Sequence, residues 1–141
     1  MYIREATMDD LENLTERDKK VTQDELYNAI NSKRVFIAEE NEVFLGWLRY
    51  NLFWDNTPFI NMLYVTEHNR GKGYGRGIIE FFEEEIKRRG YNAIMTCTRE
   101  DESSKYFYDK LGFKKIGEFT LPNGPEEIIL AKQLKEEEET I

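Results

Sequence analysis

The first half of the chain shows apolar patterns typical of a short strand, two helices and a run of antiparallel strands. Residues 2–6 alternate apolar and polar side chains, as a half-buried strand does. Thr7 or Asp9 can cap the helical segment that follows, and Thr22 precedes a second one. Segments rich in β-branched and aromatic residues, separated by polar turns, then predict three strands at 35–39, 43–53 and 59–65, with a turn at 55–58.

The second half is organised around an amphipathic helix that begins after a glycine-rich segment. Its apolar residues recur at helical spacing, at Ile78, Ile79, Phe82 and Ile86. A strand at 93–98 follows, and this strand–helix–strand order makes the fourth and fifth strands parallel. The remaining pattern predicts a helix from about 103 to 111 and two final strands, at 114–120 and 127–134.

These elements predict an α/β (α+β) fold. Its central mixed sheet has about seven strands, mostly antiparallel with one parallel pair formed by the fourth and fifth strands, and about four helices flank it. We expect residues 1–135 to form a single domain, because no linker interrupts them. Residues 136–141 begin with a run of glutamates and are expected to be a solvated acidic tail.

Composition narrows the range of partners. The 141 residues include 20 Lys and Arg against 28 Asp and Glu, a formal charge of −8, which argues against nonspecific binding to nucleic acids or anionic membranes. One cysteine and one histidine exclude a disulfide framework and a Cys- or His-based metal cluster, so no metal cofactor is expected. No apolar run approaches the ~20 residues of a membrane helix. A cytoplasmic protein is therefore expected.

The glycine-rich segment, residues 68–77, alternates glycines with basic residues between a strand and a helix. Glycines let a ligand approach the backbone, and a helix N-terminus favours anions, so the segment predicts a phosphate site. A Walker A loop is excluded because its last glycine would be followed by Lys-Ser or Lys-Thr, and neither pair occurs in this segment. A dinucleotide fingerprint is excluded as well, because positions 76 and 78 are Arg76 and Ile78 rather than glycine.

Two segments carry a resemblance to a known family. The first is Arg70-x-x-Gly73-x-Gly75, and the second is Tyr106–Phe113, one helix and one strand later. They are similar to the Q/R-x-x-G-x-G/A and A-x-x-F-Y-x-K-x-G-F segments of the GNAT N-acetyltransferase superfamily. The predicted order of elements resembles the GNAT fold over essentially the whole chain.

This resemblance implies an acetyl-CoA-dependent N-acetyltransferase that moves the acetyl group to a primary amine by direct attack in a ternary complex. Main-chain groups of Leu63 and Val65 would pair with the pantetheine arm, and Tyr108 would be the general acid that protonates the leaving thiolate. Ser104, at the family's alanine position, would lie beside the cofactor. The residues implied to hold the pyrophosphate are Arg70, Gly71, Lys72, Gly73, Tyr74, Gly75 and Arg76.

The chain departs from the family pattern at two places. Asp101 replaces a frequent asparagine and cannot donate a hydrogen bond when ionised. No glutamate occurs in residues 59–62, where some members carry a general base. Glu67, His68 and a water chain are therefore left open as the base.

The acceptor is not specified by the sequence. Small polyamines, amino sugars, lysine side chains and protein N-termini all qualify, so the partner is a small-molecule or peptide amine. An aromatic group on the third and fourth strands could line an acceptor pocket, form a homodimer contact or belong to the core: Trp47, Tyr50, Phe53, Trp54 and Phe59. A non-catalytic acyl-CoA-binding sensor is the alternative function.

Overall fold

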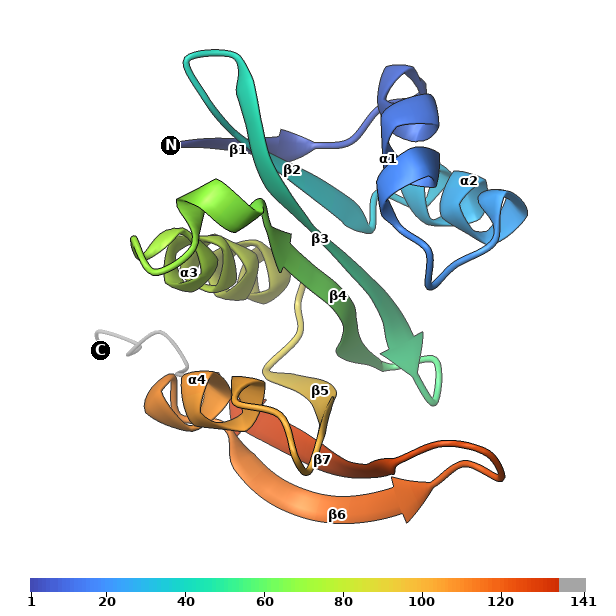
Figure 1. Cartoon of the computed structure of the whole chain (residues 1–141), viewed down its shortest axis with the longest axis vertical. Helices are drawn as coiled ribbons and strands as arrows, with labels where there is room; N and C mark the ends of the chain where they lie inside the picture. The colour runs from blue at the N-terminus through green and yellow to red at the C-terminus, as the bar shows by residue number, and fades with distance from the viewer. Residues whose placement is uncertain (135–141) are drawn as a thin grey trace. The chain divides into compact units, whose positions relative to one another are not determined.

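The structure is a computed structural model, and it describes residues 1–134. The predicted acidic tail at 136–141 lies outside the described residues. The helices in Figure 1 are η1 (Met8–Asp10), α1 (Leu11–Arg17), α2 (Gln23–Asn31), η2 (Glu67–Asn69), α3 (Tyr74–Arg88) and α4 (Ser104–Lys110). The strands are β1 (Tyr2–Glu5), β2 (Val35–Glu40), β3 (Val43–Phe53), β4 (Thr57–Val65), β5 (Ala93–Arg99), β6 (Lys114–Thr120) and β7 (Glu126–Gln133).

The strands form one mixed sheet in the order β1-β2-β3-β4-β5-β7-β6. The β4–β5 pair is parallel, with Phe59 opposite Met95 and Ile60 opposite Thr96. The pairs β1–β2, β2–β3, β5–β7 and β6–β7 are antiparallel. The predicted fold class, including the parallel fourth and fifth strands, is therefore confirmed.

Internal contacts divide the chain into two compact units. Unit 1 comprises residues 1–51 and 61–81, and unit 2 comprises residues 52–60 and the chain from Phe82 onward. The single domain over residues 1–135 stays a prediction. No helix within residues 1–134 is long and apolar enough to cross a membrane.

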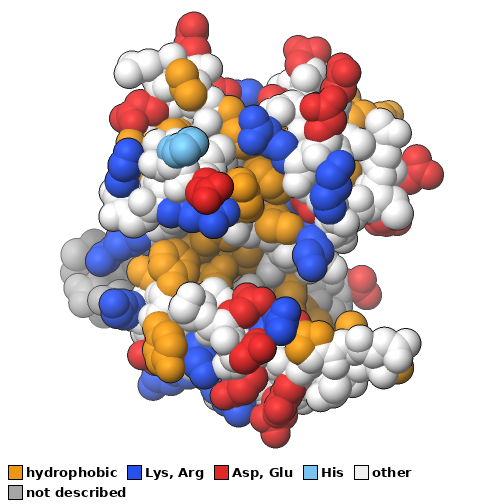
Figure 2. All heavy atoms as spheres, in the orientation of Figure 1, with side chains coloured by type: hydrophobic (Ala, Val, Ile, Leu, Met, Phe, Trp, Pro, Cys, Tyr) orange, Lys and Arg blue, Asp and Glu red, His pale blue; other side chains and the backbone are white. Residues whose placement is uncertain are grey.

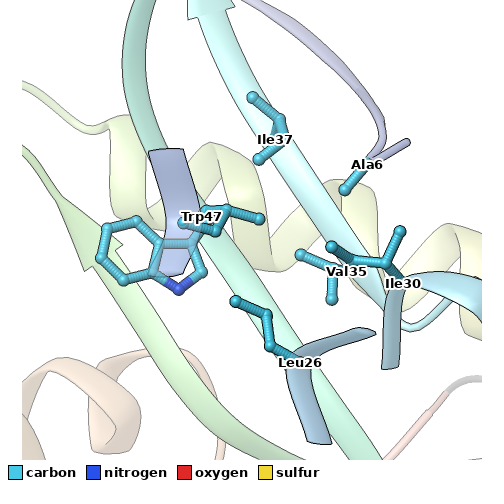
Figure 3. Close-up of a cluster of buried hydrophobic side chains, with 7 residues drawn as sticks. Ala6, Leu26, Ile30, Val35, Ile37 and Trp47 are labelled. Carbon is cyan, nitrogen blue, oxygen red and sulfur yellow. The ribbon is translucent and has the colours of Figure 1, made fainter. Parts of the chain in front are cut away.

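Unit 1 is built on the packing of α1 and α2 against β2 and β3. Figure 3 shows side chains from α2, β2 and β3 gathered together, among them Leu26, Val35 and Trp47. The cluster consists of Ala6, Leu14, Leu26, Ile30, Val35, Ile37 and Trp47. Thr22 caps α2 as predicted, since its hydroxyl accepts a hydrogen bond of 3.3 Å from the Glu25 amide. Thr7, rather than Asp9, is the N-cap of η1.

One ion pair lies inside this core. The Asp18 side chain is fully buried, and its Oδ2 accepts hydrogen bonds from Trp47 Nε1 at 3.3 Å and Arg49 Nε at 2.9 Å. A buried carboxylate is costly unless it is paired and hydrogen-bonded, and here both conditions are met. Asp18 thus fixes Arg49 of β3 to the end of α1.

Unit 2 places α4 beside β5 and the β6–β7 hairpin. Tyr108 of α4 packs edge-on against Phe113, with ring centroids 5.1 Å apart, and the Phe113 amide donates to the Tyr108 carbonyl at 3.1 Å. Gly112, with φ of 93°, makes the left-handed turn that permits this contact. Tyr108 is therefore held by its own helix end.

The turn between β3 and β4 differs from the prediction. It is a two-residue turn at Trp54 and Asp55, which have φ values of 53° and 63°, and Asn56 N–H donates to the Phe53 carbonyl at 3.1 Å. Two successive positive φ values match the right-handed twist of a hairpin. The strand β4 consequently begins at Thr57 rather than at residue 59.

The aromatic residues of β3 and β4 have mixed environments. Trp47 and Tyr50 are core residues at 1% and 3% exposure. Trp54, at the turn, is 81% exposed. Phe53 and Phe59 stack on each other with centroids 6.3 Å apart. The five aromatic residues therefore form no single surface.

Candidate active site

The glycine-rich segment connects η2 to α3 within unit 1. Gly71 and Gly73 have φ values of 77° and 86°, which side chains other than glycine rarely adopt. A Cβ added at either glycine would meet no atom within 4 Å, so the backbone faces open space. A ligand can thus reach the main chain of this loop directly.

The start of α3 adds a second feature that suits an anion. Gly77 N–H donates to the Gly73 carbonyl at 3.1 Å, which begins the helical hydrogen-bond ladder. The preceding N–H groups of a helix have no partner within it, and 15 residues of aligned peptide dipoles point their positive end here. The first turn of α3 contains no acidic residue. The loop and helix start therefore form an anion site made of backbone.

The basic side chains around the loop point in different directions. Arg70 Nε donates to the Val65 carbonyl at 2.9 Å, and its guanidinium lies 5.0 Å from the centroid of the Tyr64 ring. Arg76 Nε is 2.9 Å from Glu80 Oε1, in a pair whose side chains are 69% and 61% exposed. Such exposed pairs contribute little and exchange easily with solvent. Lys72 is exposed.

The Tyr74 side chain is hydrogen-bonded to an acidic residue. Its hydroxyl donates to Glu40 at the end of β2. This hydrogen bond lowers the pKa of Glu40 and raises the pKa of Tyr74. Tyr74 therefore offers the loop its main chain, while its side chain anchors the first turn of α3 to β2.

Positive charge at the loop is local. Figure 2 shows basic and acidic side chains interspersed on one face of the molecule, in keeping with the formal charge of −8. An anion would consequently be attracted by the loop rather than by the protein as a whole.

The end of β4 leads into the loop. Leu63 and Val65 are both half-buried there. Thr66 N–H donates to the Leu45 carbonyl at 2.8 Å, which ties the end of β4 to β3. This close approach requires Gly46, because a Cβ at that position would lie 2.1 Å from the Tyr64 carbonyl oxygen. Gly46 was not predicted from the sequence, although a lone glycine inside a predicted strand was the available signal.

Tyr108 lies in unit 2, in a buried position with 6% exposure. Its hydroxyl is hydrogen-bonded to the Thr96 side chain, and Thr96 Oγ1 donates to the Ile60 carbonyl at 3.0 Å. Burial raises the pKa of Tyr108 to about 12, although the hydrogen bond with Thr96 acts in the opposite direction. The phenol is therefore protonated at neutral pH.

The other predicted residues of unit 2 lie near the start of α4. Ser104 is half-buried, and its Oγ is 3.4 Å from Glu102 Oε2. Asp101 is exposed and forms a two-pronged pair with Arg99, at 3.1 and 3.0 Å. The Asp101 carboxylate, which replaces the family's asparagine, is thus already occupied by a neighbouring cation.

The structure groups the candidates by unit. Unit 1 brings together the residues predicted for the pantetheine arm and the pyrophosphate, from Leu63 to Arg76, and it also holds Glu67 and His68, exposed in η2. Unit 2 holds Ser104 and Tyr108. Phe59, in the region where some relatives carry a glutamate, is an aromatic residue stacked on Phe53.

Comparison with known proteins identifies the family. Residues 2–113 match the family model described as the Acetyltransferase (GNAT) family. The chain belongs to the GNAT acetyltransferase family. The match includes the glycine-rich loop and Tyr108.

Solved structures share this GNAT fold across their whole length. Ard1 from Thermoplasma volcanium superposes with a TM-score of 0.82 at 16% identity, covering 96% of this chain and 98% of that one. An aminoglycoside 6'-N-acetyltransferase complexed with coenzyme A gives 0.79 at 19% identity, with 97% and 99% covered. The yncA protein from Salmonella typhimurium, solved with its cofactor acetyl-CoA, gives 0.76 at 20% identity, with 100% and 98% covered.

Proposed function

We propose that this GNAT protein is an acetyl-CoA-dependent N-acetyltransferase that transfers the acetyl group to a primary amine. The observation that carries the proposal is the open backbone of Gly71 and Gly73 at the N-terminus of α3. Two features of one loop, left-handed glycines and a helix start, suit a pyrophosphate. The family and the CoA-bound structural relatives support coenzyme A as the molecule that carries it.

The family resemblance implies the cofactor contacts in this proposal. Main-chain groups from Gly71 to Arg76 hold the pyrophosphate, with Arg70, Lys72 and Arg76 supplying positive charge. Leu63 and Val65 offer main-chain groups to the pantetheine arm, which adds to β4 as an extra strand would. Ser104 lies along the cofactor. The carbonyl of Val65 carries a hydrogen bond from Arg70 in this structure, so the arm competes with Arg70 for it.

The reaction is a direct transfer in a ternary complex. The neutral amine nitrogen forms a bond to the thioester carbonyl carbon, the carbon–sulfur bond breaks, and the amine loses one proton. Cys97 is not an intermediate carrier, because burial and the charge of Glu127 raise the pKa of its thiol. A protonated thiol is a poor nucleophile.

Tyr108 is the general acid in this proposal. At a pKa of about 12 it holds its proton through the neutral range, which an acid must do. An ordinary thiol has a pKa of ~8.5, which is well below the pKa of Tyr108. Complete proton transfer from Tyr108 to a thiolate is therefore unfavourable. Tyr108 therefore acts late and partially, as a hydrogen-bond donor while negative charge gathers on the sulfur. Glu67, His68 and a water chain stay open as the route for the amine proton.

A thiol-release assay tests the proposal. Purified protein is mixed with acetyl-CoA and a panel of amines that includes amino acids, polyamines, amino sugars and a peptide, and free CoA is measured. We expect amine-dependent CoA release together with the acetylated amine by mass spectrometry. Tight acetyl-CoA binding with no release from any amine would replace this proposal with the non-catalytic acyl-CoA sensor. Equal thermal stabilisation by ATP, NAD and acetyl-CoA would remove the assignment of the loop to coenzyme A.

A further inference from the structure

Unit 1 contains a pocket between α2 and the sheet, and it is open to solvent. Its volume of about 340 Å³ lies at the small end of ligand-binding pockets. One side is a stripe with helical spacing along α2 and its C-terminal cap, formed by Glu25, Asn28, Ala29 and Ser32. The other side is the sheet, where Arg49 and Asn51 of β3 and Asn61 of β4 line the pocket.

The three polar side chains of the sheet share the face that is turned toward the helices. Arg49 lies on this face because its Nε donates to Asp18 Oδ2, at the end of α1, at 2.9 Å. Asn51 lies there as well, since residues two apart on a strand point to the same face. Asn61 Nδ2 donates to Asn51 Oδ1 at 2.7 Å, which places the Asn61 amide beside that of Asn51.

The end of the Arg49 guanidinium is available to a ligand. Arg49 is 7% exposed, and its terminal nitrogens, Nη1 and Nη2, make no hydrogen bond to any of residues 1–134. In the part of the chain that the structure describes, no buried side-chain nitrogen or oxygen lacks a partner, so both terminal nitrogens reach solvent. We infer that they reach it through the pocket that Arg49 lines. Donors held in this way favour a ligand that presents an oxygen.

The charges around the pocket favour a neutral oxygen over a carboxylate. Asp18 is fully buried beside Arg49, so the two form a nearly neutral pair. Glu25 is exposed at the rim and adds a negative charge. Arg34 also borders the pocket, but it stands opposite Tyr50 in the β2–β3 register, so its side chain belongs to the other face of the sheet. A carboxylate would therefore gain little net attraction here, whereas a carbonyl oxygen can still accept hydrogen bonds from Arg49.

The two asparagines offer a donor and an acceptor next to each other. Their mutual hydrogen bond uses Asn61 Nδ2 and Asn51 Oδ1, and it leaves Asn51 Nδ2 as a donor and Asn61 Oδ1 as an acceptor. The amide group of a ligand matches both, because its carbonyl accepts and its N–H donates. A carboxylate could use only the donor, and an ammonium only the acceptor.

We propose that this pocket recognises a neutral amide group of the acceptor, through the terminal nitrogens of Arg49 and the amides of Asn51 and Asn61. The acceptor is then an amine that also carries a carboxamide or a peptide group. The proposal rests on the proposed transferase function. Asn61 precedes Leu63 by two residues, so the pocket begins about 7 Å along β4 from the main chain assigned to the pantetheine arm.

The experiment compares amines that share a carbon skeleton and differ in one group. One set is L-phenylalaninamide, L-phenylalanine and phenethylamine, and the other is L-lysinamide, L-lysine and cadaverine. Binding is measured by calorimetry on the whole protein, and transfer is measured by CoA release. We expect at least one amide to bind and react about tenfold better than both other members of its set. L-Phenylalanylglycinamide, added to the first set, shows whether a peptide group or a free carboxamide is preferred.

The double variant Asn51→Ala/Asn61→Ala removes both amides from the pocket. It should reduce the preference for the amide about fivefold or more, because hydrogen bonds to the ligand are lost, and leave the KM for acetyl-CoA unchanged. Both side chains are exposed, so the fold should tolerate the change. Arg49→Lys keeps a cation for Asp18 but removes the fork, and it should also reduce the preference. Its melting temperature shows whether it is folded.

Asn13→Ala is the matched control, because the Asn13 amide accepts from Arg17 Nε at 2.9 Å within α1, outside the pocket. It should keep the preference. Equal binding within both sets, a carboxylate as the best ligand, or a preference that survives in the double variant or in folded Arg49→Lys would overturn this assignment even if amines are acetylated. Amide binding that depends on the two asparagines without any CoA release would support the pocket and refute the transferase function, so the two failures are distinguishable.

Discussion

The Arg70 side chain donates from Nε to the main-chain carbonyl of Val65 at 2.9 Å while its guanidinium lies over the Tyr64 ring. Tyr64 in turn packs against Trp47 of the core with its ring tilted by 31°, and the two centroids are 4.7 Å apart. Arg70 is thus held at the end of β4 by one hydrogen bond and one cation–π contact. It occupies a carbonyl that the proposed contact with the pantetheine arm would use.

Arg70→Ala should have opposite effects on two cofactor fragments. Acetyl-CoA should bind about threefold to tenfold more weakly, because a cation near the pyrophosphate is lost, an effect of about 1 kcal/mol. Acetyl-pantetheine, which has no phosphate, should bind equally well or better, because the Val65 carbonyl is free. Dissociation constants from calorimetry at low and at 0.5 M salt provide the measurement.

Salt dependence is the internal control for this prediction. Only the loss of acetyl-CoA affinity in Arg70→Ala should become smaller at high salt. A loss of equal size for both ligands would mean that Arg70 supports the loop structurally rather than competing for Val65.

Gly73→Ala should weaken acetyl-CoA binding at least tenfold, because the added methyl group would block the open face of the loop. A Cβ here meets no protein atom within 4 Å and would extend into the space through which a ligand reaches the backbone. The left-handed φ of 86° adds strain of about 1–2 kcal/mol to the folded state. Melting temperature and acetyl-CoA affinity are measured on the same samples.

The Gly90→Ala variant distinguishes the effect of backbone strain from the effect of obstructing the ligand. Gly90 ends α3 with φ of 95°, and a Cβ there also meets nothing within 4 Å. Both variants should lose similar stability, and only Gly73→Ala should lose affinity. Similar affinities for acetyl-CoA in the two variants would indicate that the loop is an ordinary turn that does not bind the cofactor.

Periodicity in the sequence was sufficient to predict the order of the elements and the parallel pair. Ile78, Ile79, Phe82 and Ile86 mark α3 because an amphipathic helix repeats its apolar face every three to four residues, and all four are buried. The glycine loop was predictable for a similar reason, since repeated glycines indicate a backbone that a ligand can approach closely. In the structure, Gly71 and Gly73 adopt positive φ.

Contacts between distant segments were beyond prediction. The turn at Trp54–Asp55 places a tryptophan at positive φ, which this bulky residue rarely adopts, so strand pairing imposed the turn against the local preference of Trp54. The Asp18–Arg49 pair joins residues 31 positions apart. A single sequence without its fold contains no periodic signal for these relationships.

Cys97→Ala should retain full transfer activity, with a change in kcat of less than about twofold. Burial and the negative charge of Glu127 raise the pKa of the thiol above its ordinary value, so the thiolate fraction near neutral pH is small and grows only toward alkaline pH. Initial-rate kinetics should give intersecting rather than parallel double-reciprocal lines, as a ternary complex requires. An acetylated Cys97 peptide that appears and decays at the catalytic rate would contradict direct transfer.

Tyr108→Phe should lower kcat by ~10²–10⁴-fold with little change in acetyl-CoA affinity, because general acid catalysis is typically worth that much and the ring is preserved. The fold should tolerate the change, since Thr96 Oγ1 still donates to the Ile60 carbonyl and is not left without an acceptor. Tyr106→Phe is the control, because Tyr106 is 62% exposed and should be nearly silent.

A leaving-group series distinguishes the acid role of Tyr108 from a packing role. The acid matters most when the departing sulfur is strongly basic, so the rate loss in Tyr108→Phe should shrink for acetyl thioesters whose thiols are more acidic than CoA. The pH profile gives a second test. Because burial places the pKa of Tyr108 at about 12, deprotonation of this tyrosine should cause no loss of activity below about pH 10.5. The wild type and Tyr108→Phe should therefore share the same alkaline profile at different heights. A loss that is constant across the thioesters would assign Tyr108 to packing against Phe113 and leave the thiolate to depart unassisted.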